Sequence, residues 1–234
     1  MTAPALFACT NPVHEHWQLG PLTRVDGHVS LLGWCVPGNS PDAGVPEPVG
    51  RLVCRALTRV ARLSFPVAAA PGPVPDVPPG ADGDQLQRLV AHGLIERAAL
   101  AWRGLPSRVN LLTTRRADTA MALFDDALFS WPLQAQIVLL SPPDAAPPRI
   151  THESLRSLIG EHWALHAAPL RSMGVFGVLR PGVDGDVAGL LSMSDGAERK
   201  LMDALADEAR LAGFHWCLLS ESDFSDRLRT SLAG

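Results

Sequence analysis

The chain lacks several features that assign a protein quickly to a class. It contains no tyrosine, and Lys200 is the only lysine among its 20 basic residues. Its four cysteines include no CxxC pair, which argues against a zinc knuckle and a disulfide-stapled secreted domain. No apolar run approaches the roughly 18 residues of a membrane span, and the N-terminal residues carry no positively charged signal region. We therefore expect a cytoplasmic protein with reduced thiols.

Motifs for phosphate binding and nucleophilic catalysis are also missing. The sequence has no GxGxxG, no GxxxxGK followed by serine or threonine, and no GxSxG. Its formal net charge of −4 argues against a chain-wide basic footprint for nucleic acid. We expect no cofactor, no metal and no membrane contact.

What is present is the composition of a globular chain. With 234 residues, 47% of them apolar and 19% charged, it can bury a core without metal or disulfide. The use of arginine in place of lysine, with 21 prolines and 20 glycines, is typical of a GC-rich genome and suggests a bacterial-type protein.

Proline-rich stretches suggest how the chain is divided. They occur at residues 37–48, 66–79 and 141–148. Proline disfavours helix interiors and central strands, so these stretches are predicted to be loops or connectors. The predicted organisation is an N-terminal α+β segment at 1–65, a proline-rich linker at 66–83 and an α/β domain at 84–234. One continuous domain is the alternative.

Apolar spacing predicts the secondary structure. Spacings of three and four residues predict helices at 49–63, 84–103, 114–129, 151–166 and 195–212. Short apolar runs predict strands at 28–34, 108–113, 134–140, 175–180, 187–193 and 214–219. Their alternation predicts an α/β fold, with a mixed, largely parallel sheet flanked by helices in the C-terminal half. The N-terminal half is predicted to be a smaller α+β unit.

The first candidate site follows the predicted strand at 108–113. Thr114, Arg115 and Arg116 lie where this strand ends and a helix begins. Ligands bind outside the carboxyl ends of parallel strands, and two guanidinium groups beside a helix N-terminus can hold a phosphate or carboxylate. Asp144, after the next strand, is expected at the same edge. A capping threonine with solvated arginines is the alternative. Other polar residues at predicted strand ends are Ser141, Glu221 and Asp223.

The second candidate site is a set of arginines on the predicted helix at 49–63. Like charges four residues apart disfavour a helix by about 0.2–0.5 kcal/mol per pair. Acidic groups of the same chain, an acidic protein partner or nucleic-acid phosphate can compensate. The acid-rich predicted helix at 195–212 is the internal candidate. Nucleic acid is disfavoured because this helix lacks the interleaved aromatics of single-strand binders. The arginines are Arg51, Arg55, Arg59 and Arg62.

Two further patterns contain the residue types of a metal site. Residues 184–189, DGDVAG, resemble the DxDxAG element of toprim domains, in which paired carboxylates hold Mg²⁺. The glutamate that such a domain also needs is missing from the earlier predicted strand ends, and Asp-Gly is a preferred hairpin turn. His162 and His166 stand four residues apart on the predicted helix at 151–166, without an identifiable third ligand. We therefore expect a turn and helix-edge histidines.

The sequence supports two main functional hypotheses. The first is a non-catalytic accessory or regulatory module that binds another protein through the arginine-bearing helix. The alternative is an α/β enzyme or ligand-binding domain for an anionic small molecule, with Arg115 and Arg116 as a clamp. Catalysis there would need Asp144, Glu221 or Asp223 as a base. A nucleic-acid-processing component is the third hypothesis.

Overall fold

The computed structural model describes residues 3–12, 27–38, 45–69, 96–100, 108–125, 138–146, 167–181 and 187–232. Its strands are β1 (Ala5–Thr10), β2 (His28–Cys35), β3 (Arg62–Ala69), β4 (Glu96–Leu100), β5 (Arg108–Thr114), β6 (Val138–Ser141), β7 (Gly177–Pro181), β8 (Val187–Ser192) and β9 (His215–Leu218). Its helices are α1 (Glu47–Val60), α3 (Ala117–Asp125), α5 (Ala167–Ser172), α6 (Asp195–Leu211) and α7 (Glu221–Leu232).

These strands form one nine-stranded sheet in the order β4-β5-β3-β6-β7-β8-β2-β1-β9. Only β1 and β9 pair in parallel, and every other neighbouring pair is antiparallel. The predicted α/β class is therefore confirmed, but the prediction of a largely parallel sheet is wrong. The physical reason is that β3 lies between β5 and β6, and β2 lies between β1 and β8. Strands that run in the same direction are thus separated by one that runs the opposite way.

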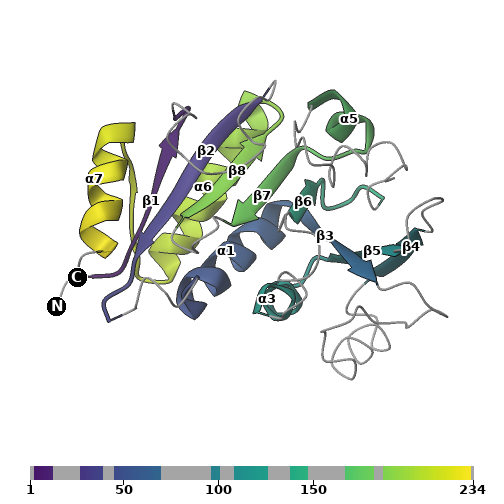
Figure 1. Cartoon of the computed structure of the whole chain (residues 1–234), viewed down its shortest axis with the longest axis horizontal. Coiled ribbons are helices and arrows are strands. Elements are labelled where there is room, and N and C mark those ends of the chain that lie inside the picture. The colour runs from purple at the N-terminus through teal and green to yellow at the C-terminus, as the bar shows by residue number, and fades with distance from the viewer. Residues whose placement is uncertain are drawn as a thin grey trace.

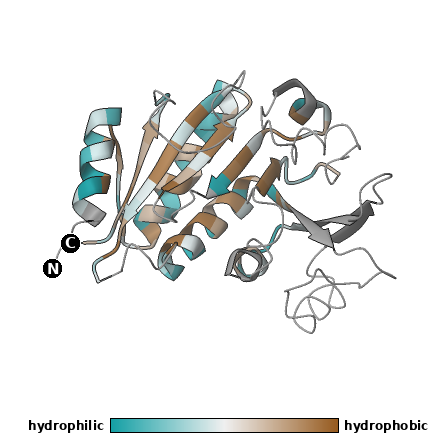
Figure 2. Cartoon of the chain, in the orientation of Figure 1, coloured by the Kyte–Doolittle hydropathy of each residue, from teal (hydrophilic) through white to brown (hydrophobic). Residues whose placement is uncertain are grey.

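Helices cover both faces of this sheet (Figure 1). The first face packs against α1, α3 and α6, and the second packs against α7. Alternate residues of a strand point to opposite faces, so Leu190 belongs to the first core and Leu191 to the second. Figure 2 shows hydrophobic residues along the central strands and α1, and hydrophilic residues along α7. Burial of β6 and β8 on both faces follows from this layering.

The strand β3 corrects the predicted end of the first helix. Helix α1 ends at Val60, and Arg62 and Leu63 begin the strand instead of continuing the helix predicted at 49–63. Leu63 enters the core beneath α1, so its apolar spacing fits the helix pattern although the residue is extended. Periodicity alone does not separate these two cases.

The same strand contains the start of the predicted linker. Pro66 pairs with Leu111 of β5, while β6 pairs only with residues 62–64 of β3. At Pro66, β3 is therefore paired on one side only in the described residues. A strand tolerates proline at such a position, because the missing N–H is not needed for a second neighbour. The rest of the predicted linker, 70–83, lies outside the described residues.

Strand β4 contradicts the helix predicted at 84–103. Residues 96–100, ERAAL, have high helix propensity but pair antiparallel with β5. Pairing in the sheet thus overrides the local preference. Residues 84–95 and 101–103, the helix predicted at 151–166 and the turn at 182–186 lie outside the described residues.

Helix α6 is as the sequence predicts. The side chain of Ser194 accepts a hydrogen bond from the Ala197 N–H, and Gly213 follows the helix with a φ of +76°. Strands from residues 1–65 share the sheet with strands of the C-terminal half, since β2 pairs with β8 and β1 with β9. The boundaries at 65/66 and 83/84 stay a prediction.

Candidate functional site

Three arginines stand in line on the outer side of α1, and we call Arg51, Arg55 and Arg59 the arginine row. The helix places residues four apart on one face at intervals of about 6 Å. The opposite side of α1 is buried, with Leu52, Leu57 and their neighbours in the core beneath. The arginine side chains stay 46%, 51% and 49% exposed. The row is therefore a surface of α1 and not part of its packing.

One buried carboxylate lies beside two of these arginines. Nη1 of Arg55 is 4.0 Å from Oε1 of Glu208, and Nη1 of Arg59 is 3.7 Å from its Oε2. The Glu208 side chain, on α6, is only 10% exposed. Arg51 pairs with Glu47 in the first turn of its own helix. The like charges of α1 are thus compensated within the chain, in part by the acid-rich helix that the sequence identifies as the internal candidate.

Arg62 does not belong to the arginine row. It alternates along β3 with Leu63, which points to the α1 face, so its side chain emerges on the opposite face of the sheet. There a guanidinium nitrogen donates to the carbonyl oxygen of Pro143 at 3.5 Å. The grouping of Arg62 with the other three arginines is therefore wrong, because the helix ends before it.

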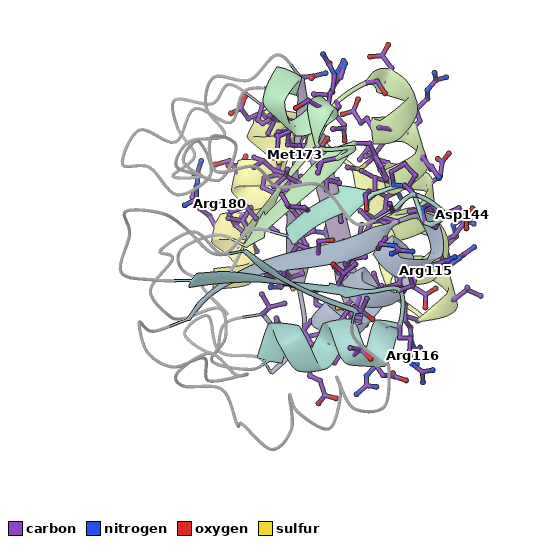
Figure 3. The ribbon with its side chains drawn as sticks, turned by 90° about the vertical axis from the view of Figure 1, so that its right-hand side faces the viewer. Arg115, Arg116, Asp144, Met173 and Arg180 are labelled. Atoms are coloured by element: carbon purple, nitrogen blue, oxygen red, sulfur yellow. The ribbon has the colours of Figure 1, made fainter. Side chains whose placement is uncertain are left out.

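The structure brings the first candidate site together at one edge of the sheet. We call Thr114, Arg115, Arg116 and Asp144 the strand-end cluster. Strands β5 and β6 both run antiparallel to β3, so their carboxyl ends lie on either side of the start of β3. Nη1 of Arg115 is 3.6 Å from Oδ1 of Asp144. Figure 3 shows Arg115, Arg116 and Asp144 on one side of the molecule, with Arg180 on the other.

The charged side chains of the cluster are open to solvent, whereas Thr114 is buried. The side chains of Arg115 and Asp144 are 50% and 92% exposed, so this ion pair is screened by water. The hydroxyl of Thr114 accepts a hydrogen bond from the backbone N–H of Arg116, which fixes the chain at the entry to α3. The side chain of Arg116 is also exposed to solvent.

Of the other polar residues expected at strand ends, Ser141 ends β6 next to the start of β3, whereas Glu221 and Asp223 lie elsewhere. Glu221 and Asp223 begin α7, after β9, and β9 is five strand positions from β6. At about 4.8 Å per position this is about 24 Å. Asp223 accepts a hydrogen bond from the Ser220 hydroxyl at 2.6 Å, and its N–H donates to the same oxygen, which caps α7. They cannot serve as a base beside Arg115.

A cluster of polar side chains that the sequence does not predict lies at the start of α6. Nε2 of His28 is 2.6 Å from Oδ1 of Asp195, and its Nδ1 is 3.7 Å from Oε2 of Glu198. The Ser30 hydroxyl donates to Glu198 at 2.8 Å. The Oγ of Ser192, the cross-strand partner of His28, is buried without a hydrogen-bond partner in the described residues. Only the pairing of β2 with β8 unites these residues, so no sequence spacing indicates the group.

Burial shifts the pKa of two groups outside these sites. Desolvation, and then the charge of Glu221, raises the pKa of the Cys9 thiol above its ordinary value. Cys9 is therefore a protonated, buried thiol at neutral pH and not an activated nucleophile. Burial also lowers the pKa of the Arg180 guanidinium, in β7.

Within the described ranges, no three histidine, cysteine, aspartate or glutamate side chains are grouped to hold a metal ion. None of the helices in those ranges is long and apolar enough to cross a bilayer. Comparison of the chain with known protein families, curated proteins and solved structures finds no match in any of the three. The arginine row and the strand-end cluster are therefore the two surfaces from which a function can be inferred.

Proposed function

We propose that this protein is an accessory or regulatory module that binds an acidic segment of another protein through the arginine row. The observation that carries the proposal is the exposure of three guanidinium groups in line, with the carboxylate of Glu208 buried beside two of them. The buried carboxylate orients Arg55 and Arg59 while leaving about half of each side chain in solvent. A partner that replaces this solvent gains charge-assisted hydrogen bonds to side chains that are already positioned.

The spacing of the row fits a protein chain with repeated acids. Neighbouring arginines are about 6 Å apart along the helix, which matches acids at alternate positions of an extended strand or at every fourth position of a helix. Arginine presents a planar fork of donors that matches a carboxylate in two contacts. The chemistry that supports the proposal is therefore acidic, multivalent and peptide-like.

The test uses a fluorescent twelve-residue polyglutamate peptide, with polyglutamine as the uncharged comparison. Anisotropy at low and high salt measures binding. The variant Arg55→Gln, Arg59→Gln, Glu208→Gln removes both cations together with the carboxylate beside them, so that no buried charge is left alone. We expect at least a tenfold loss of affinity for polyglutamate, because two of the three contacts in the row are removed.

The matched control removes two arginines and one acid from other helices, giving the same change in net charge. Arg210 pairs with Asp207, and Arg229 pairs with Asp226, all on exposed faces of α6 and α7. The control is Arg210→Gln, Asp207→Asn, Arg229→Gln, and it should bind the peptide as the wild type does. Equal losses in both variants would show that only overall charge matters and would contradict the proposal. Binding of a DNA oligonucleotide in place of the peptide would favour the nucleic-acid hypothesis.

A second candidate function rests on the strand-end cluster. Arg115 pairs there with one highly exposed carboxylate, and the neighbouring Arg116 side chain is also exposed, so this end of the strands carries two guanidinium groups and one carboxylate. This favours a site for a phosphate- or carboxylate-bearing small molecule. A ligand at 100 times its dissociation constant stabilises a protein by about 2.7 kcal/mol. Thermal stabilisation by phosphate or citrate that disappears in Arg115→Gln, Arg116→Gln would support this function, and its absence in the wild type would exclude it for these ligands.

A further inference from the structure

The strand β9 is one edge of the sheet, and its outer side has no neighbour in the described residues. It pairs with β1 alone, over residues 215–218. Helix α7 packs on β1 and β2, one strand further in, and no helix of the described residues lies along the outer side of β9. His215 and Leu218 are exposed, and Trp216 and Cys217 are partly exposed. The edge is therefore open to an approaching strand.

The backbone of β9 offers matched donors and acceptors on this side. The N–H groups of His215 and Leu219 donate to Pro4 and Ala8, on the β1 side. Because bonding alternates along a parallel strand, Trp216 and Leu218 direct their N–H and C=O groups away from β1. In the described structure these groups face outward, and an added strand would satisfy them.

The side chains of β9 do not protect the edge. Natural sheets commonly place lysine, other charges or proline on an open edge to prevent pairing with another chain. The sequence of β9 is HWCL, with neither proline nor a carboxylate, lysine or arginine, whereas the opposite edge strand contains Glu96 and Arg97. Leu218 is 60% exposed. An exposed apolar side chain thus accompanies the open backbone.

We infer that a second copy of this chain docks on β9, antiparallel and related by a twofold axis at Cys217. In this register Trp216 of each copy pairs with Leu218 of the other, and both outward residues of each copy exchange N–H and C=O bonds. The aromatic and aliphatic side chains meet in cross-strand pairs. The two sheets then form one continuous sheet through a symmetric interface.

The other symmetric registers use fewer of the available groups. An axis at Trp216 pairs Leu218 with Phe214, whose N–H is already bonded to Ala209. An axis at Leu218 pairs Trp216 with Ser220, the cap of α7. Only the register with its axis at Cys217 uses the outward N–H and C=O groups of both Trp216 and Leu218 in each copy. Because β9 can pair with itself in this way, we infer that the occupant is a second copy of the chain. A four-residue pairing is small against the about 1,200–2,000 Å² of a stable interface, so we expect a concentration-dependent dimer.

Sedimentation equilibrium of the full chain across the micromolar range tests the inference. We expect a monomer–dimer equilibrium of the 25.0 kDa chain. Leu218→Lys should weaken the dimer at least tenfold, because each copy would place a charge opposite Trp216 of the other, and it should fold because Leu218 is mostly exposed. The matched control is Val45→Lys, before α1, where an exposed apolar residue lies away from β9. This variant should dimerise as the wild type does.

Cross-linking fixes the register. Opposed residues of a non-hydrogen-bonded antiparallel pair have Cα atoms about 4.5 Å apart, within the range that a disulfide spans. In a Cys35→Ser background, with Cys9 and Cys54 buried, oxidation by copper phenanthroline should join two chains through Cys217, and Cys217→Ser should abolish the product. A wild-type chain that stays monomeric overturns the inference. So does a dimer that Leu218→Lys leaves intact or that Cys217 does not cross-link.

Discussion

Gly33 lies in β2 beneath a pair of aromatic rings. Phe7 and Phe224 are fully buried and meet edge to face, with their centroids 5.1 Å apart. A Cβ at Gly33 would lie 2.5 Å from Cε2 of Phe7 and 3.0 Å from Cζ of Phe224. The absence of a side chain at Gly33 therefore allows α7 to pack onto β1 and β2.

The first prediction concerns this contact. Gly33→Ala should lower the free energy of unfolding by about 1–3 kcal/mol, the usual cost of overpacking a core. Urea denaturation monitored by circular dichroism measures the change. Gly196→Ala is the matched control, since a Cβ there meets nothing within 4 Å and the residue is helical. It should be neutral or stabilising by up to about 1 kcal/mol. If both variants are equally stable, the aromatic pair does not constrain Gly33.

At the scale of the element, the sequence predicts a helix well when the signals for it lie within that segment of the chain. The cap at Ser194, the stop at Gly213 and the apolar stripe of α6 all depend on neighbours along the chain, and the sequence predicts this helix closely. Strand β4 has no such local signal, because its residues favour a helix and only the partner strand β5 makes them extended. The same limit applies to the sites. The four-residue spacing of the arginine row can be predicted from the sequence alone, whereas its contact with Glu208 depends on how α1 packs on α6.

The second prediction concerns that contact between two helices. Arg59 and Glu208 should be energetically coupled by about 0.5–1 kcal/mol at low salt, because the arginine is half exposed and the carboxylate is buried. A double-mutant cycle of Arg59→Gln and Glu208→Gln, measured by urea unfolding, gives the coupling energy. The comparison cycle pairs Arg59→Gln with Asp207→Asn, whose carboxylate bonds to Arg210 in its own helix. The interpretation of the row as internally oriented fails if the two cycles give the same coupling.

At the scale of the whole molecule, the order of the strands is what the sequence could not supply. Two strands that run in the same direction pair in parallel only if no other strand is inserted between them. Strand β3 separates β5 from β6, and β2 separates β1 from β8. The pairings of β3 with β6 and of β2 with β8 join strands that are not consecutive in the sequence. This order also decides the site. It places Arg115 beside Asp144 and puts Glu221 at the start of α7, after the distant strand β9, so the strand-end cluster has fewer members than the sequence suggests.

The last prediction concerns the two halves of the chain as separate fragments. Residues 1–83 contain β1 and β2, whose outer neighbours β9 and β8 come from residues 84–234. Separation would expose both strands along their full hydrogen-bonding edges and would open the core that Leu32 and Trp34 share with α6. We expect neither fragment to fold alone, as judged by the dispersion of its amide NMR signals. The intact chain should unfold in one transition that coincides by circular dichroism and tryptophan fluorescence. A fragment 84–234 that unfolds cooperatively by itself would instead support the division at 83/84, because its strands would then be stable without β1 and β2.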